Sequence, residues 1–123
     1  MSVFSDPNCI FCRIVRGEIP SRKVYEDDDV LAFHDIQPVA PVHLLVIPKT
    51  HVATLYDTTD AHAVALGRIM TLAGRLAKEQ GASDGFRTIV NTGRVGRQEV
   101  MHVHVHVIAA PEPLGPMIVR KAS

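Results

Sequence analysis

Histidine and valine alternate strictly over the six residues from His102 to Val107. In an extended strand successive side chains point to opposite faces. The pattern therefore places three imidazoles on one face and three β-branched side chains on the other. We expect a strand over residues 101–108 that has one face in the core and one face that carries chemistry.

Neighbouring imidazoles on such a face lie about 7 Å apart, so the outer two can hydrogen-bond to whatever the middle one holds. Neutral imidazole is a good nucleophile, and neighbouring rings or backbone carbonyls can fix which nitrogen carries the proton. The pattern therefore favours nucleophilic catalysis. Two alternatives stay open: a solvated face that happens to be rich in histidine, and a metal site to which His-x-His supplies two ligands.

The rest of the chain predicts two helices and four more strands. Asn8 is a candidate N-cap for a short helix that runs to the stop signal at Gly17. Capping residues at 58–60 precede a long helix up to Gly81, with its apolar stripe at 3.6-residue spacing. That stripe comprises Leu66, Ile69, Met70, Ala73, Leu76 and Ala77. The predicted strands are 23–26, 30–34, 42–47 and 86–91, and the acidic residues 27–29 are read as a solvated hairpin tip.

This order of elements predicts an α+β fold with a five-stranded, mainly antiparallel sheet. We expect a single domain over residues 1–123, with an N-terminal arm at 1–8 and a C-terminal tail at 109–123. Lys plus Arg equals Asp plus Glu at thirteen each, which gives no reason to expect a nucleic-acid partner. No apolar run approaches the roughly 18–20 residues of a membrane helix, and the N-terminus lacks a signal-peptide pattern. We expect a cytoplasmic protein with no membrane partner.

Cys9 and Cys12 are the only cysteines in the chain. In a reducing compartment, a spacing of three residues indicates metal or redox work rather than a structural disulfide. A redox role is the weaker interpretation, because the strand–motif–helix context of thioredoxins is absent.

Several segments in order along the chain carry a family resemblance. The segment from His102 to Ile108 reads His-φ-His-φ-His-φ-φ, where φ is apolar, and further segments accompany it. These are Ile10–Val15, Gly17–Pro20, Tyr25–Asp28, Ala32–Ile36, Pro41–His51 and Val90–Gly93. Together they resemble the histidine triad (HIT) superfamily, and within it the Hint branch of nucleoside phosphoramidases. The resemblance runs from about Cys9 to Ile108. It implies a five-stranded sheet with a helix packed on it, and homodimers with sheets continuous across the interface.

The resemblance also implies a reaction. His104 would attack the α-phosphorus of a purine nucleoside 5′-phosphoramidate, the amine would leave, and water would hydrolyse the nucleotidyl-imidazole. This route requires no metal. Within the catalytic triad of His102, His104 and His106, we expect His106 to donate to the phosphoryl oxygens. Further donors would be the backbone after His104, Gln98 and Asn91.

Upstream residues complete the implied site. His43 matches the histidine that orients the triad, although a satisfied core histidine is the simpler interpretation of a lone case. Asp35 matches the carboxylate that binds the ribose diol. Five apolar residues match those that sandwich the base, and a purely structural core role remains open for all of them: Phe11, Ile14, Ile19, Phe33 and Ile36.

A zinc site is also implied. Cys9 and Cys12 need two further ligands to close a tetrahedron, and His51 and His102 can supply them. This set resembles the structural zinc site of many bacterial Hint proteins. Such an ion would tie the N-terminal helix to the catalytic strand.

The chain departs from the family pattern before the triad. Where Hint proteins commonly read Gly-Gln-Ser, this chain reads Arg97-Gln98-Glu99. Glu99 could point to solvent, bind a cationic amine of the substrate, or repel phosphate. Arg97 could offset that charge or contact phosphate. The tail also lacks the tryptophan of animal members, so leaving-group specificity does not transfer.

Three rival functions remain open. The chain could hydrolyse dinucleoside polyphosphates, as the fragile-histidine-triad branch does. It could be a nucleotide-binding or scaffold protein with little turnover, for which Glu99 is the motivating feature. It could also be a catalytic metalloenzyme that uses His104 and His106 as ligands.

Overall fold

The computed structural model describes residues 4–120 and shows one five-stranded antiparallel sheet with strand order β1-β2-β3-β5-β4. The elements are α1 (Ile10–Val15), β1 (Lys23–Glu26), β2 (Val30–His34), β3 (Val42–Pro48), the 3-10 turns η1 (Leu55–Asp57) and η2 (Asp60–His62), α2 (Ala63–Glu79), β4 (Arg87–Ile89) and β5 (Val105–Ala109). The predicted α+β fold with one long and one short helix is confirmed. Among the described residues, no helix has the length and apolarity needed to cross a bilayer.

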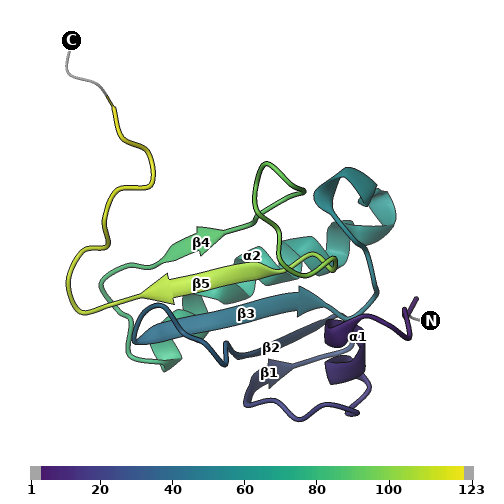
Figure 1. Cartoon of the computed structure of the whole chain (residues 1–123). Helices are drawn as coiled ribbons and strands as arrows, with labels where there is room; N and C mark the ends of the chain where they lie inside the picture. Colours follow the sequence, from purple (N-terminus) through teal and green to yellow (C-terminus); the bar gives the residue numbers. More distant parts are fainter. Residues whose placement is uncertain (1–3, 121–123) are drawn as a thin grey trace.

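The two helices cover opposite faces of the sheet (Figure 1). Alternate side chains of strand β3 point to opposite faces of the sheet and so pack in two different apolar clusters. Leu44 and Val46 pack in the cluster that contains α2. Leu45 and Ile47 pack in the cluster that contains α1. The unbroken apolar run in β3 therefore reflects burial on both sides of a central strand.

Helix α1 begins one residue later than the Asn8 cap predicts. Cys9 is the N-cap, and its Sγ accepts the backbone N–H of Cys12 at 3.4 Å. Gly17 follows the helix with φ of +80°, a left-handed conformation that glycine adopts without a Cβ penalty. The expected stop signal is therefore confirmed.

Helix α2 begins at Ala63 rather than near Thr58, because two capped 3-10 turns fill the intervening residues. Its buried stripe also differs in phase from the predicted one. Met70 is 54% exposed, whereas Ala65 and Leu72 are buried. Residues at 65, 69, 72, 73, 76 and 77 follow the 3.6-residue period more closely than a set that includes Met70.

The acidic hairpin is not a simple solvated tip. The carboxylate of Asp27 accepts hydrogen bonds from the Tyr25 hydroxyl at 2.8 Å, from the backbone N–H of Val30 at 2.9 Å and from the Arg68 guanidinium of α2. Burial works to raise the pKa of Asp27, but these donors outweigh it and hold that pKa far below its usual range. Asp27 therefore ties the hairpin to the long helix, and Asp28 is the one residue of the three acidic residues in this turn that is exposed.

Strand β5 is shorter than its alternating sequence predicts, since it begins at Val105. The preceding residues turn toward the loop after β3, where Val103 donates its N–H to the Val52 carbonyl at 2.8 Å. This turn carries His102 beneath α1, where its side chain is fully buried. Strand β4 is likewise three residues long instead of six.

Candidate functional site

His104 lies just before β5, with 5% of its surface exposed. Its Nδ1 lies 2.8 Å from the backbone carbonyl oxygen of His102, which can only accept. We therefore assign the proton to Nδ1, which leaves a lone pair on Nε2. The ring packs edge-on against Phe11 and His106, with centroid distances of 5.2 and 5.0 Å. This tautomer is the one that a nucleophilic imidazole requires.

His106 receives its orientation from His43 on β3. The backbone N–H of Val39 donates to His43 Nδ1 at 3.1 Å, so the His43 proton resides on Nε2. That Nε2 lies 2.9 Å from His106 Nδ1 and donates to it. His106 consequently carries its own proton on Nε2, where it can serve a phosphoryl oxygen or a leaving group.

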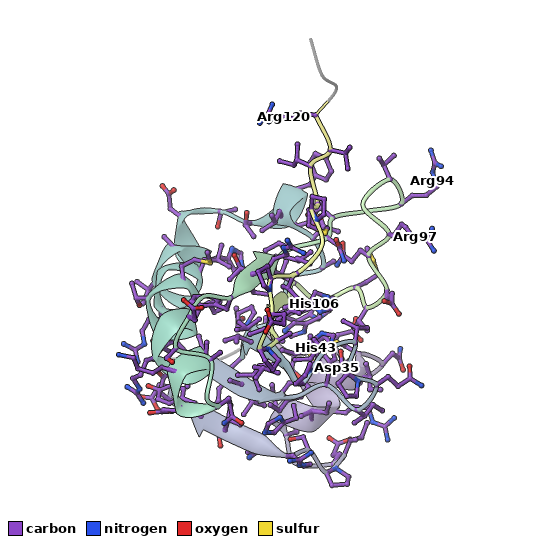
Figure 2. The ribbon with its side chains drawn as sticks, turned by 90° about the vertical axis from the view of Figure 1, so that its left-hand side faces the viewer. Asp35, His43, Arg94, Arg97, His106 and Arg120 are labelled. Carbon is purple, nitrogen blue, oxygen red and sulfur yellow. The ribbon has the colours of Figure 1, made fainter. Side chains whose placement is uncertain are left out.

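Asp35 extends this chain of hydrogen bonds. Its Oδ2 lies 3.3 Å from His43 Nε2, and its Oδ1 accepts the Gln37 N–H at 2.8 Å. Figure 2 shows Asp35, His43 and His106 grouped together. The structure thus places the predicted sugar-binding carboxylate beside the histidine that orients the triad.

The electrostatic surroundings keep His106 uncharged near neutral pH. Burial lowers the pKa of His106, and the neighbouring His104 and His43 lower it further. The carboxylates of Asp35 and Glu99 act in the opposite direction. The balance lies below the ordinary histidine value, which matches the neutral tautomer inferred from the hydrogen bonds.

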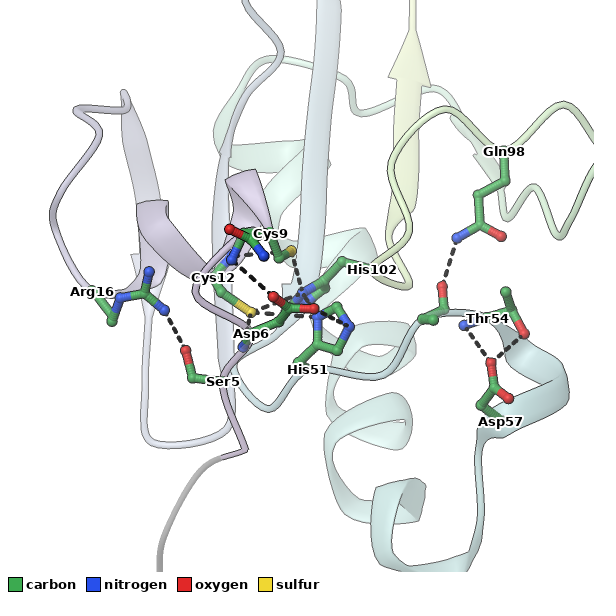
Figure 3. Close-up of polar contacts among 12 residues, drawn as sticks. Ser5, Asp6, Cys9, Cys12, Arg16, His51, Thr54, Asp57, Gln98 and His102 are labelled. Atoms are coloured by element: carbon green, nitrogen blue, oxygen red, sulfur yellow. Dashed lines mark hydrogen bonds and ion pairs between the residues drawn. The ribbon is translucent and has the colours of Figure 1, made fainter.

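A second cluster joins α1 to the segment before β5 (Figure 3). Cys9 Sγ lies 3.4 Å from His102 Nδ1, and Cys12 Sγ lies 3.4 Å from His51 Nδ1. The two Nδ1 atoms are 3.2 Å apart, and all four ligand atoms lie within 4.8 Å of one another. The four residues predicted as zinc ligands are therefore brought together.

The tautomers in this cluster fit a metal ion. His102 Nε2 lies 2.8 Å from the carbonyl oxygen of Pro48, so Nδ1 keeps its lone pair toward the sulfurs. His51 Nε2 faces the Asp6 carboxylate at 4.0 Å, which favours the same arrangement. Backbone N–H groups of Asp6 and Cys12 donate to the sulfurs of Cys12 and Cys9, respectively, both at 3.4 Å. Two thiolates and two neutral imidazoles form a tetrahedral zinc donor set.

Asp35, His43 and His106 also lie within 4.8 Å of one another, but their tautomers do not suit a metal. The Val39 N–H occupies the lone pair of His43 Nδ1, so His43 Nε2 carries a proton. His106 Nδ1 accepts the hydrogen bond from this N–H and has no free lone pair. This geometry favours proton positioning, and it argues against His106 as a ligand of a catalytic metal.

Gln98 fastens the loop between β4 and β5. Its Oε1 accepts the Gly93 N–H at 2.9 Å, and its Nε2 donates to the carbonyls of Ala53 and Val100 at 2.7 and 2.9 Å. Both amide hydrogens are thus engaged by the backbone. The sequence predicts Gln98 as a phosphate donor, but the structure leaves it no free N–H and gives it the role of shaping this loop.

The same loop displays two arginines (Figure 2). Arg97 adopts a left-handed φ of 60°, and the guanidinium groups of Arg94 and Arg97 make no hydrogen bond or ion pair within residues 4–120. Glu99 is exposed and lies near enough to His106 to raise its pKa. The half-buried Asn91 likewise has no side-chain partner in the described chain, so its amide remains available to a ligand.

The five predicted base-binding residues divide into two groups. Phe11, Ile14 and Phe33 are buried in the apolar cluster under α1, where Phe11 packs edge-on against Phe33. Ile19 is only partly buried at the margin of that cluster, and Ile36 is 92% exposed. The structure thus leaves mainly Ile19 and Ile36 accessible to a base, while the other three are buried and Phe11 packs against His104.

Sequence reasoning missed several groups that complete the two clusters. The Val39 N–H and the Pro48 carbonyl fix two histidine tautomers, yet backbone atoms leave no signal in side-chain patterns. Asp6 was missed as well. Its position three residues before Cys9 is the signal that could have revealed it, because an aspartate that precedes a Cys-x-x-Cys pair can support a ligand.

The chain is similar to known proteins over most of its length. The HIT domain family model matches residues 16–112. The purine nucleoside phosphoramidase of Escherichia coli strain K12 is 50% identical over 113 residues, which cover 91% of this chain and 94% of that protein. A 14 kDa zinc-binding protein of Brassica juncea is 48% identical over 101 residues, 80% of this chain and 89% of that protein. The solved structure of a HIT family hydrolase from Clostridium thermocellum superposes with a TM-score of 0.87 at 40% identity, covering 94% of this chain and all of that one.

Proposed function

We propose that this chain, which belongs to the HIT domain family and is a nucleotide hydrolase of that type, cleaves the P–N bond of purine nucleoside 5′-phosphoramidates. The reaction passes through a nucleotidyl intermediate on His104. The observation that carries the proposal is the tautomer of His104. Its Nδ1–H is held by the His102 carbonyl, so Nε2 presents a lone pair. The purine preference follows the phosphoramidase relative.

The reaction then has two displacements. His104 Nε2 forms a bond to the α-phosphorus while the P–N bond to the amine breaks, and His106 Nε2–H donates to the phosphoryl oxygen or to the departing nitrogen. Water next forms the new P–O bond while the bond to His104 breaks, which releases the nucleoside monophosphate. One difficult displacement is thereby divided into two easier ones.

The remaining site residues bind the substrate in this proposal. The carboxylate of Asp35 accepts from the sugar diol, Asn91 donates to the phosphate, and Ile19 and Ile36 contact the base. Glu99 lies on the leaving-group side and favours an amine that carries positive charge.

We further propose that Cys9, Cys12, His51 and His102 hold a structural zinc ion. The donor set, the tautomers and the N–H···S bonds support this assignment. When bound, zinc would link α1 to the segments that carry His51 and His102, and it would take no part in the hydrolysis. A reducing compartment such as the cytoplasm, in which both thiols stay free, suits this site.

A homodimer completes the proposal. Helix α2 exposes an uncharged face, formed by Val64, Gly67, Met70, Thr71 and Gly74. Beside it lie the edge strand β4 and the exposed side chain of Phe86, which contacts the Gly74 position. An uncharged helix face next to an unpaired strand edge suits a two-fold interface in which the sheets continue from one subunit to the other.

The test is the release of AMP from adenosine 5′-phosphoramidate, followed by chromatography. We expect turnover by the wild type and by His62→Ala, a half-buried control outside the site, and a loss of at least about a thousandfold in His104→Ala. Tight nucleotide binding without AMP release from the wild type would contradict the proposal and favour a binding protein of low turnover.

Hydrolysis of dinucleoside polyphosphates is the second candidate. The guanidinium groups of Arg94 and Arg97, which have no partner among residues 4–120, favour it, because arginine recognises phosphate groups. Comparing kcat/KM for diadenosine polyphosphates and the phosphoramidate decides between the two. A preference for the polyphosphate that disappears in the Arg94→Ala, Arg97→Ala double variant would establish this candidate.

A further inference from the structure

One proton in the site has two competing acceptors. The Val39 N–H occupies His43 Nδ1, so the neutral ring of His43 carries a single proton, on Nε2. That nitrogen lies 2.9 Å from His106 Nδ1 and 3.3 Å from Asp35 Oδ2. One N–H cannot make two full hydrogen bonds, so the carboxylate draws on the same proton that orients His106.

The backbone fixes Asp35 in this position. Its N–H donates to the His43 carbonyl at 3.0 Å, and its Oδ1 accepts the Gln37 N–H. Oδ2 is the oxygen that faces His43, and it can also accept from an incoming donor. The Asp35 side chain is 19% exposed and the His43 side chain only 4%, so Asp35 is the more accessible member of the pair.

We propose that Asp35 couples recognition of the sugar to the chemistry at phosphorus. A vicinal diol that donates to Asp35 Oδ2 satisfies the carboxylate and releases the His43 proton entirely to His106 Nδ1. His106 is then held with its Nε2–H directed outward to the phosphoryl group. This inference rests on the proposed function, and it makes Asp35 a positioning residue as well as a sugar ligand.

The charged and titratable groups around His106 agree with this coupling. They are His43 from β3, His104 before β5, Glu99 from the loop and Asp35 after β2, while the neighbour on β4 is the apolar Ile89. Asp35 is one of the two groups that raise the pKa of His106. A diol bound to Asp35 weakens that pull and favours the neutral, donating form of His106.

The kinetic test compares adenosine 5′-phosphoramidate with its 2′,3′-dideoxy analogue. If Asp35 only binds sugar, loss of the diol raises KM and leaves kcat unchanged. With the coupling, kcat also falls, by roughly five- to tenfold, in the wild type and in the matched control Asp28→Asn. In His43→Asn the carbonyl oxygen still faces Val39 but the shared proton is gone. The diol should then affect KM alone, and an unchanged kcat in the wild type would overturn the proposal.

A measurement without turnover separates the coupling from the proposed activity. The ¹⁵N shifts of the His106 ring report its tautomer, and AMP should move them toward a pure Nε2–H form whereas 2′,3′-dideoxy-AMP should not. The same shift with both ligands would overturn the coupling. If phosphoramidates are not turned over at all, the proposed function fails, yet this spectrum still decides whether Asp35 links the sugar to His106.

Discussion

The role of each histidine in the site is set by the partner of its other ring nitrogen. A carbonyl oxygen holds the Nδ1–H of His104 and frees Nε2 for attack, whereas a backbone N–H occupies Nδ1 of His43 and keeps its proton on Nε2. A carbonyl also holds the Nε2–H of His102, which frees Nδ1 for a metal. In the proposed function, three histidines of one chain therefore serve as nucleophile, orienting group and metal ligand because of their backbone neighbours.

The pH dependence of stability follows from the buried His102. Burial is the main cause that lowers its pKa to about 4; the hydrogen bond to Pro48 acts to raise that pKa, and His51 and His104 act to lower it further. Between pH 6.5 and about 4 the unfolded chain binds a proton that the folded chain does not, so the free energy of unfolding rises with pH. We expect the metal-free protein to lose on the order of 3 kcal/mol over that range.

Urea denaturation at several pH values in the presence of a chelator measures this effect. The control His62→Asn, at a half-buried histidine of η2, should lose as much free energy of unfolding between pH 7 and pH 4 as the wild type does. A free energy of unfolding that stays constant from pH 7 to pH 4 would show that His102 is charged in the folded protein.

The backbone conformation of Arg97 lowers the stability of the folded protein by a measurable amount. Its φ of 60° lies in the left-handed region that disfavours side chains with a Cβ. We expect Arg97→Gly to stabilise the protein by about 1 kcal/mol. The matched control is Arg94→Gly, in the same loop but with an ordinary φ, which should be neutral or destabilising. Equal effects of the two substitutions on the urea midpoint would exclude backbone strain as the cause.

At the scale of elements, the cluster of cysteines and histidines holds α1 against the segment before β5. That segment carries His104, and Phe11 of α1 packs against its ring. We expect Cys12→Ser to weaken zinc binding and to reduce turnover without removing the nucleophile. Loss of an ion present at a hundred times its Kd removes about 2.7 kcal/mol of stabilisation.

Native mass spectrometry and the cobalt-substituted spectrum measure this prediction. The wild type should hold one ion per chain and show thiolate-to-cobalt charge transfer, and Cys12→Ser should lose much of both. The exposed serine variant Ser83→Ala serves as control. Equal metal content and an equal Tm in wild type and Cys12→Ser would refute a structural ion at these residues.

Regular patterns in the sequence predicted the helices and strands well, whereas contacts in the folded chain determine where each one begins and ends. The alternation at residues 102–107 predicted a strand, but the turn that buries His102 shortens it to Val105–Ala109. The stripe on α2 predicted a helix, yet two threonine-capped 3-10 turns postpone its start to Ala63. The turn before β5 depends on the hydrogen bond from Val103 to the distant Val52 carbonyl, which side-chain spacing does not reveal, whereas the 3-10 turns depend on local caps.

In the candidate site, too, the sequence predicted some features and the folded structure determined others. The motifs predicted which residues form the candidate site, and the four residues predicted as zinc ligands do lie together. The role of Gln98 in the loop and the tautomer set by Val39 depend on three-dimensional neighbours, so the sequence alone could not predict them. The sequence left both a core role and a base contact open for Phe33, and only the structure shows its burial.

At the scale of the whole molecule, the uncharged face of α2 and the edge of β4 predict the assembly. A charge at the centre of that face should separate the subunits, because burying it without a partner is costly. We expect Met70→Asp to elute as a monomer in size-exclusion chromatography with light scattering. Ile10→Asp, exposed on α1 across the sheet, should remain dimeric. A wild type that is monomeric at micromolar concentration would contradict the assembly.

The nucleotidyl intermediate on His104 is the central claim, and intact-protein mass spectrometry during rapid mixing with adenosine 5′-phosphoramidate tests it most directly. We predict a transient increase by the mass of one adenylyl group on the wild type, mapped to His104 and followed by AMP, with no such adduct on His104→Ala. AMP release without any adduct at any mixing time, or an adduct that persists in His104→Ala, would contradict the account.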